Sequence, residues 1–509
     1  MDRSLIFTFI FHHFLFSFSC AASKPNIVMI VADDLGWNDV GFHGSNQIPT
    51  PNLDKLALNG VILNNYYVTP ICSPSRSAIM TGKYPIHTGM QTSTVFGPNA
   101  WGLDPKETLL PRYLQLQGYK THAVGKWHLG MSSRSYLPHN RGFDTFYGYY
   151  LGKGDYWDHS NVETFWGLDL HDNDKPVFNQ WGNYSTDMYT AEAIDRIRNH
   201  NKSAPLFLYL AYQAVHSANR QADPIQAPDK WIEKFQHIQN IERRKFAAVT
   251  AALDEAVGKV YQSISDAGIL DNTVIVFTTD NGGPANGFDY NYANNHPLRG
   301  VKAHLWEGGV RGVAFVNSKL MGKPGRVSHE LMHITDWLPT FLDLAGGKSS
   351  TLKIDGKNIW GAIAYGEQSP REDILLNIDP LLYKNAALRV GNYKIIQGEK
   401  AGPWSGWFPP PEVDLAPEHP NPIIREATIK CGPRPANATK DCSDACLFDI
   451  KKDPCEYNDL SNEQPELMLA LLDRLNGYKG GMVKPRNNFT NDPLANPKIH
   501  GGNWQPWLP

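Results

Sequence analysis

The residues whose types and spacing most clearly suggest chemical reactivity lie in the pentapeptide CSPSR, which runs from Cys72 to Arg76. A thiol at this point could be a reactive nucleophile, half of a disulfide or a small core residue. The pentapeptide follows a strand-like run at 65–68 and precedes a helix-like run that starts near Ser77. A helix start and the Arg76 guanidinium both favour negative charge. The sequence therefore predicts an anion-friendly environment around Cys72.

Two acidic pairs offer ligands for a metal ion. Asp33 and Asp34 follow one apolar run, and Asp280 and Asn281 follow another. Three carboxylates and an amide oxygen suit Ca²⁺ or Mg²⁺ rather than zinc, and these ligand types do not separate the two ions. A single Asp-Asp pair is more typical of a turn or a helix cap. Two such pairs on separate strands favour a metal site.

The elements that must position these residues are buried strands. The apolar runs at 26–32, 120–124, 206–211 and 274–279 do not alternate with polar residues, as expected of parallel strands covered on both faces. A fifth run lies at 313–316, and helices are expected at 51–60 and 242–267. Ligands of such α/β sheets bind beyond the carboxyl ends of the strands. Four of the runs lead to polar residues there: Asp33-Asp34, Lys126 and His128, His216, and Asp280-Asn281.

A smaller unit is expected after residue 370. Residues 389–396 are typical of a hairpin that turns at Gly391-Asn392, and 447–450 predicts another strand. The proline-rich segment 403–435 is expected to be extended, and 466–475 predicts a helix that ends near Gly477. We expect a catalytic domain at 23–370 and a small α+β domain at 371–509, built from an antiparallel sheet plus a helix.

The N-terminus predicts export. A charged start, an apolar stretch to about residue 18 and small residues near Ala22 indicate a signal peptide at 1–22 rather than a membrane anchor. No later stretch is apolar enough to span a bilayer, and the net charge of −3 gives no general attraction to nucleic acid or to an anionic membrane. N-glycosylation sequons at Asn183, Asn201, Asn437 and Asn488 fit the secretory pathway.

The cysteine pattern singles out Cys72. Cleavage of the signal peptide removes Cys20, and the other four cysteines crowd near the C-terminus: Cys431, Cys442, Cys446 and Cys455. Four cysteines in an exported protein predict two disulfides with three possible connectivities. Cys72 is then unpaired, and conversion of its thiol to another group would explain that.

Several motifs resemble one enzyme family. The spacing Cys-x-Pro-x-Arg, followed by Thr81-Gly82, is the signature of the type I sulfatases. The segments 125–130 (GKWHLG), 280–283 (DNGG), 297–302 (PLRGVK), 305–311 (LWEGGVR) and 407–411 (WFPPP) resemble arylsulfatase B and its relatives. The resemblance covers nearly the whole chain after the signal peptide, and its motifs are highly specific.

The resemblance implies an alkaline-phosphatase-like fold and hydrolysis of sulfate esters. It implies that a formylglycine-generating enzyme converts Cys72 to formylglycine, whose hydrate supplies a nucleophile for sulfur and a second hydroxyl through which sulfate leaves. It also implies one Ca²⁺ bound by Asp33, Asp34, Asp280, Asn281 and the modified Cys72. Carried over in the same way are Arg76 as support of that cluster, Lys126 and Lys302 on the sulfate oxygens, His128 beside the nucleophile and His216 as the acid for the leaving alcohol.

The sequence leaves the substrate open. We expect N-acetylgalactosamine 4-sulfate units of chondroitin or dermatan sulfate, with small aryl or dietary sulfates as the alternative. A phosphate-ester hydrolase and a non-catalytic, secreted carbohydrate-binding relative are less favoured. Trp404, Trp407 and Phe408 could form a wall for a sugar ring or pack the two domains together. The expected location is the lysosome or the extracellular space.

Overall fold

The computed structural model describes residues 24–409 and 419–509. The largest sheet in these residues has ten strands. The predicted signal peptide and Cys20 lie outside the described residues. Within them, the strand order of the sheet is β13 (Arg326–Ser328), β2 (Val61–Leu63), β12 (Ala314–Asn317), β11 (Thr273–Thr279), β1 (Asn26–Ala32), β10 (Leu206–Ala211), β4 (Lys120–Lys126), β5 (Thr145–Tyr149), β8 (His171–Asp172) and β9 (Lys175–Pro176).

The centre of this sheet is parallel. Strands β11, β1, β10, β4 and β5 run in one direction, whereas β12 pairs antiparallel with both β11 and β2. The strands β8 and β9 also pair antiparallel at the other edge. The predicted α/β class with a mostly parallel sheet is confirmed.

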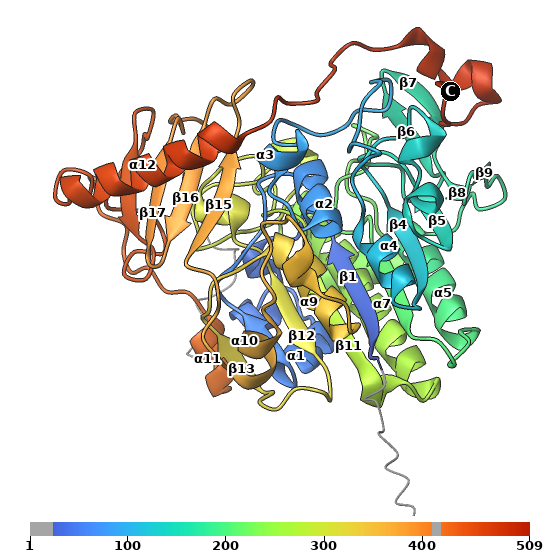
Figure 1. Ribbon diagram of the computed structural model, residues 1–509, viewed down its shortest axis with the longest axis horizontal. Helices are drawn as coiled ribbons and strands as arrows, with labels where there is room; N and C mark the ends of the chain where they lie inside the picture. The colour runs from blue at the N-terminus through green and yellow to red at the C-terminus, as the bar shows by residue number, and fades with distance from the viewer. Residues whose placement is uncertain (1–23, 410–418) are drawn as a thin grey trace, which may run out of the picture.

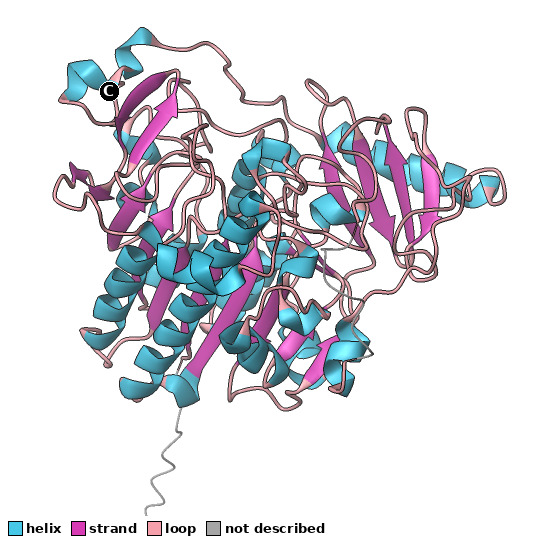
Figure 2. Cartoon of the chain, turned by 180° about the vertical axis from the view of Figure 1, so that it is seen from behind, coloured by secondary structure: helices cyan, strands magenta, loops and turns pink. Residues whose placement is uncertain are grey.

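Helices cover both faces of the sheet because β1 sends alternate side chains to opposite sides (Figures 1 and 2). Val28 and Ile30 join the core under α1 (Pro51–Leu58), α5 (Ser185–Arg198) and α7 (Ile241–Asp266). Ile27 and Met29 join the core under α2 (Cys72–Thr81), α4 (Leu110–Leu116) and α9 (Trp337–Leu344). The predicted helices at 51–60 and 242–267 correspond to α1 and α7.

A separate antiparallel sheet follows, as predicted. It consists of β15 (Asp373–Ile378), β16 (Ala386–Val390), β17 (Tyr393–Gln397) and β18 (Cys446–Asp449), and α12 (Pro465–Gly481) packs on it through Met468, Leu471 and Leu475. The expected end of the helix near Gly477 is wrong. No other part of the described chain lies within 4 Å of a side chain built at Gly477, and one exposed glycine costs a helix only about 1 kcal/mol.

The remaining elements are short. The smaller sheets pair β3 (Tyr66–Tyr67) with β14 (Met332–His333) and β6 (Ser160–Glu163) with β7 (Phe165–Leu168), and the other helices are α3 (Pro85–Thr88), α6 (Asp229–Ile232), α8 (Glu307–Val310), α10 (Trp360–Tyr365) and α11 (Pro422–Ala427). Helix α11 corrects the expectation of an extended 403–435 segment, because Asn421 caps it and Pro422 fits its first position.

The C-terminal region is tied down in two ways. Disulfides join Cys431 to Cys455 and Cys442 to Cys446, which selects one of the three connectivities, and Cys72 is free. After α12 the chain runs back to the neighbourhood of β6 and β7 (Figure 1), where β-bridges join Asn491 to residue 99, Asn503 to Leu168 in β7 and Leu508 to residue 133. The predicted boundary at 370/371 stays a prediction. No helix in the described part of the chain is long and apolar enough to cross a membrane.

Candidate active site

The polar residues that follow the central strands meet at one edge of the sheet. Asp33 follows β1, Asp280 follows β11, and Lys126 ends β4. Because these strands are parallel and lie in the order β11-β1-β10-β4, their carboxyl ends share that edge. Gly125 lets β4 approach β10 there: its φ is +96°, and a Cβ on it would lie 1.9 Å from a carbonyl oxygen of β10.

Arg76 forms ion pairs with Asp280 and Asp33. The residue is fully buried, and its Nε and Nη2 donate to Oδ2 of Asp280 at 3.0 and 2.8 Å. Its Nη2 also lies 3.6 Å from Oδ1 of Asp33. Nζ of Lys126 donates to Oδ2 of Asp33 at 2.6 Å. The two carboxylates are therefore balanced by two buried cations.

A second group of contacts surrounds Asp34. Nζ of Lys302 donates to Oδ2 of Asp34 at 2.9 Å, and Nε2 of His216 lies 3.2 Å from the same oxygen. The other ring nitrogen of His216, Nδ1, is 2.8 Å from the carbonyl oxygen of Ser217. A proton on Nδ1 would make that hydrogen bond, which leaves Nε2 facing Asp34 and Lys302.

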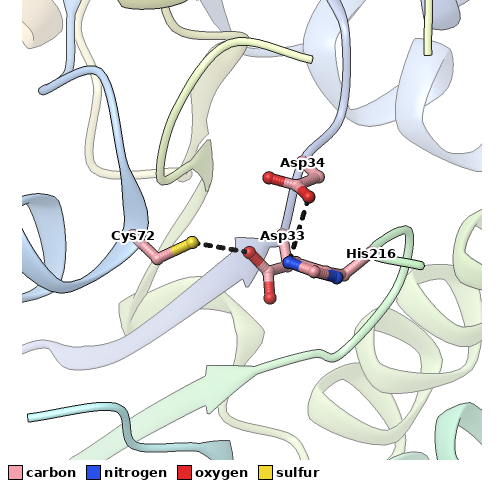
Figure 3. Close-up of side chains that lie close together, drawn as sticks. All are labelled: Asp33, Asp34, Cys72 and His216. Carbon is pink, nitrogen blue, oxygen red and sulfur yellow. Dashed lines mark hydrogen bonds and ion pairs between the residues drawn. The ribbon is translucent and has the colours of Figure 1, made fainter. Parts of the chain in front are cut away.

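Cys72 lies at the centre of these residues. It is the first residue of α2, is only 2% exposed, and its Sγ is 3.7 Å from Oδ1 of Asp33 (Figure 3). One ligand atom from each of Asp33, Asp34, Cys72 and His216 lies within 4.8 Å of the others. The structure thus brings Cys72 together with the acidic pairs, as the sequence predicts.

The donor set fits a hard divalent cation. Oδ1 of Asp280 and Oδ1 of Asn281 are buried and have no hydrogen-bond partner. Buried polar atoms are usually paired, so two unpaired oxygens beside the carboxylates of Asp33 and Asp34 indicate a place for an ion. Oxygen ligands of this kind suit Ca²⁺ or Mg²⁺, while Arg76, Lys126 and Lys302 balance the carboxylates from outside.

Burial dominates the electrostatics. It raises the pKa of Asp33 to about 8, with a further contribution from Asp280, and it also raises the pKa of Asp34. Burial acts in the same direction on Asp280, but Arg76 and then Lys126 hold the pKa of that carboxyl below its usual value. Burial likewise raises the pKa of the Cys72 thiol, so the unmodified residue is a poor nucleophile.

His128 faces the same region from the loop after β4. It is a buried residue with a left-handed backbone, at φ +59°. Its Nε2 lies 3.1 Å from the carbonyl oxygen of Val95, and its buried Nδ1 has no partner. Asp34 is also left-handed, at φ +65°. Strained backbone of this kind persists where the surrounding structure holds it and is common at functional sites.

Two charged residues that sequence reasoning missed lie beside the group. Asp289 is 3.0 Å from Nζ of Lys302 and 3.2 Å from Nζ of Lys153. Lys153 follows β5 by four residues, so recognition of 145–149 as another parallel strand would have pointed to it. Asp289 lies in a loop with no motif, and no sequence signal identifies it.

The aromatic residues considered for a sugar-binding wall divide into two roles. Nε1 of Trp407 donates to the carbonyl oxygen of Cys455, and its ring packs on Tyr457 and lies 4.4 Å from Cζ of Arg299, so this residue packs the C-terminal region against the segment that carries Arg299. The ring of Trp404 lies 5.5 Å from that of Phe288, next to Asp289, and 6.3 Å from that of Phe408. Only Trp404 and Phe408 therefore stay candidates for the wall.

Comparison with known proteins decides the family. The family profile named Sulfatase matches residues 25–347. The chain belongs to the sulfatase family. The sequence resemblance is confirmed at this level, and the chain is an enzyme that hydrolyses sulfate esters. The finer resemblance to arylsulfatase B stays a prediction.

Individual relatives give the same picture of this sulfatase. Arylsulfatase J of Mus musculus is 42% identical and aligns over 96% of this chain and 81% of its own length. N-acetylgalactosamine-6-sulfatase of Homo sapiens is 31% identical over 74% of this chain and 72% of its own. The crystal structure of Ps i-CgsB in complex with k-i-k-neocarrahexaose has a TM-score of 0.75 and 29% identity, covering 94% of this chain and 98% of that one. The sulfatase neighbours support the predicted alkaline-phosphatase-like fold.

Proposed function

We propose that residue 72 of this sulfatase carries the nucleophile that attacks the sulfate ester. The reaction would take place between the metal-ligand side chains and the two buried lysines. The observation that carries the proposal is the position of Cys72 Sγ, 3.7 Å from Asp33 and within the same 4.8 Å group as Asp34 and His216. The Cys72 thiol of this structure marks the position of the formylglycine that a formylglycine-generating enzyme would introduce in the active protein. That group supplies an oxygen nucleophile for sulfur and a second hydroxyl through which sulfate is released.

The metal is proposed to be one Ca²⁺, held by the side chains of Asp33, Asp34, Asp280, Asn281 and residue 72. Bound there, the ion would neutralise charge that develops on the sulfuryl oxygens. The charges of the chain support this arrangement. When all three carboxylates are ionised, as metal ligands must be, they balance the charges of three cations, Arg76, Lys126 and Lys302. A divalent ion makes the set positive, as attraction of a sulfate ester requires.

The chain's own residues bind and orient the sulfate. Lys126 and Lys302 are proposed to hold sulfuryl oxygens through Nζ, where water is excluded because both residues are at most 4% exposed. Arg76 keeps Asp280 ionised and fixed. His128, whose buried Nδ1 has no hydrogen-bond partner, is proposed to act beside the nucleophile at residue 72. His216 faces the site through Nε2 and is proposed, once this nitrogen is protonated, to give that proton to the leaving oxygen.

The proposed substrate is the sulfate ester of a carbohydrate, with N-acetylgalactosamine 4-sulfate units of chondroitin or dermatan sulfate as the first candidate. Two relatives support a sugar: one is named for N-acetylgalactosamine 6-sulfate, and another was solved with a neocarrahexaose. The name arylsulfatase J keeps a small aryl sulfate as the second candidate. The proposed location is the secretory pathway, ending in the lysosome or outside the cell.

Defined esters test the proposal. Formylglycine-containing protein should release sulfate from N-acetylgalactosamine 4-sulfate disaccharides faster than from 6-sulfate disaccharides or aryl sulfates, and should not turn over the matched phosphate esters. Cys72→Ser should lose multiple turnover, because a serine has no second hydroxyl through which the sulfate can leave. Full turnover by Cys72→Ser would disprove the proposed role of residue 72. A preference for aryl sulfates would replace the proposed substrate and leave that role intact.

A further inference from the structure

Asp289 bridges the cations at the mouth of the proposed site. Its Oδ2 lies 3.0 Å from Nζ of Lys302 and 3.7 Å from Nε2 of His216. Its Oδ1 lies 3.2 Å from Nζ of Lys153. A single carboxylate thus contacts two lysines and borders the histidine.

These contacts coincide with the ones that the substrate needs. The proposed function places a sulfuryl oxygen on Lys302 and the leaving oxygen near His216. Oδ2 of Asp289 already lies within hydrogen-bond distance of Lys302 and close to His216. A substrate oxygen cannot share that position, and the like charges of a carboxylate and a sulfate group repel each other.

Two carboxylates, those of Asp34 and Asp289, contact Nζ of Lys302, and only that of Asp289 can move toward solvent. The side chain of Asp34 is fully buried, whereas that of Asp289 is 28% exposed. Asp289 lies in a surface loop in which Asn286, Gly287, Asp289 and Tyr290 all have positive φ, and the Tyr290 side chain is exposed. Non-glycine residues in this conformation carry strain that a change of loop conformation can relieve.

We propose that Asp289 sets the affinity for substrate, as an internal anion that occupies the sulfate-oxygen position beside Lys302 and is displaced when a sulfate ester binds. The inference rests on the proposed function, because the roles given to Lys302 and His216 define that position. Lys153 is the cation that keeps the displaced carboxylate at the rim of the site.

Inorganic sulfate, a product of the reaction, is the probe. Asp289→Asn keeps the shape of the side chain and removes its charge. The inhibition constant of sulfate and the KM for the sulfate ester should both fall roughly tenfold, which corresponds to a change of about 1.4 kcal/mol in binding. Asp289→Glu keeps the charge and should restore wild-type values. Values for Asp289→Asn that are unchanged or higher would overturn the inference.

Asp271→Asn is the matched control. Asp271 also forms an exposed ion pair with a lysine, Lys319, but it lies just before β11 begins, at the opposite edge of the sheet from the site. This variant makes the same change in net charge and should leave both constants unchanged. Equal falls in both variants would show a general charge effect and contradict the role of Asp289.

Wild-type protein provides a measurement that needs no variant. Displacement of Asp289 should make the amides of residues 286–291 exchange hydrogen faster when sulfate is saturating. Slower exchange of this segment would show that sulfate closes the loop, and would overturn the inference. If the wild-type protein hydrolyses no sulfate ester, the proposed function fails instead. Normal turnover with an unchanged sulfate constant in Asp289→Asn rejects the inference alone.

Discussion

Removal of the Arg76 guanidinium should destabilise the protein strongly, because Asp280 would stay buried without its cation. Arg76 and Asp280 are both fully buried, and two guanidinium nitrogens reach one carboxylate oxygen at 3.0 and 2.8 Å. Loss of one partner of such a pair costs about 3–5 kcal/mol in the free energy of unfolding. We therefore expect Arg76→Met to lose this amount in the presence of a chelator.

The double variant separates charge balance from chemistry. Arg76→Met combined with Asp280→Asn removes both charges, so its loss should be smaller than the sum of the single losses by at least about 2 kcal/mol. Urea unfolding followed by tryptophan fluorescence measures all three free energies. The double variant should still lack turnover, because a proposed metal ligand and its support are both gone. Additive losses would refute the interpretation of Arg76 as the partner of Asp280.

Three further predictions follow from other parts of the structure. Burial raises the pKa of Glu456 to about 7, although Lys394 opposes this and Glu307 adds to it, so the folded state binds this proton more tightly than the unfolded chain does. The contribution of this group to the free energy of unfolding is complete below about pH 4.5 and falls by on the order of 3 kcal/mol as the pH rises to about 7. The Glu456→Gln variant should lack this fall when thermal unfolding is measured across the pH range, and a pH profile equal to that of the wild type would contradict the assignment. The Cys72 residue is only 2% exposed. The formylglycine-generating enzyme should therefore not convert Cys72 in purified folded protein that still carries the thiol, but should convert it in the unfolded chain. Conversion of the folded protein would show that the site opens. Gly125→Ala should lower the free energy of unfolding by at least about 2 kcal/mol, because its Cβ meets a β10 carbonyl and its φ is positive; wild-type stability in chemical denaturation would disprove this.

The central site could be predicted because its residues follow buried strands. The apolar runs that became β1, β4, β10 and β11 fixed which polar residues share one sheet edge, and the structure places Asp33, Lys126 and Asp280 there. Cys72 and Arg76 were found through their motif. The short-range pattern of residues was enough for these elements, because parallel strands bring their ends together whatever lies between them.

The outer part of the site could not be predicted in the same way. Asp289 reaches Lys302 from a loop whose shape depends on contacts such as that between Ser217 Oγ and the Asp289 carbonyl oxygen. The return of the C-terminal segment to β7 and to His171 in β8, whose Nε2 lies 2.8 Å from the Trp504 carbonyl oxygen, also depends on tertiary contacts. Disulfide pairing likewise depends on which cysteines the fold brings close. None of these features leaves a periodic or spaced pattern in the sequence.

The most direct test of the account is the mass of the tryptic peptide that ends at Arg76, measured on protein from a cell that can form formylglycine and compared with sulfatase activity across preparations. The account predicts an aldehyde in place of the thiol at residue 72, and activity in proportion to the converted fraction. Full activity from protein whose residue 72 is still a cysteine would contradict it.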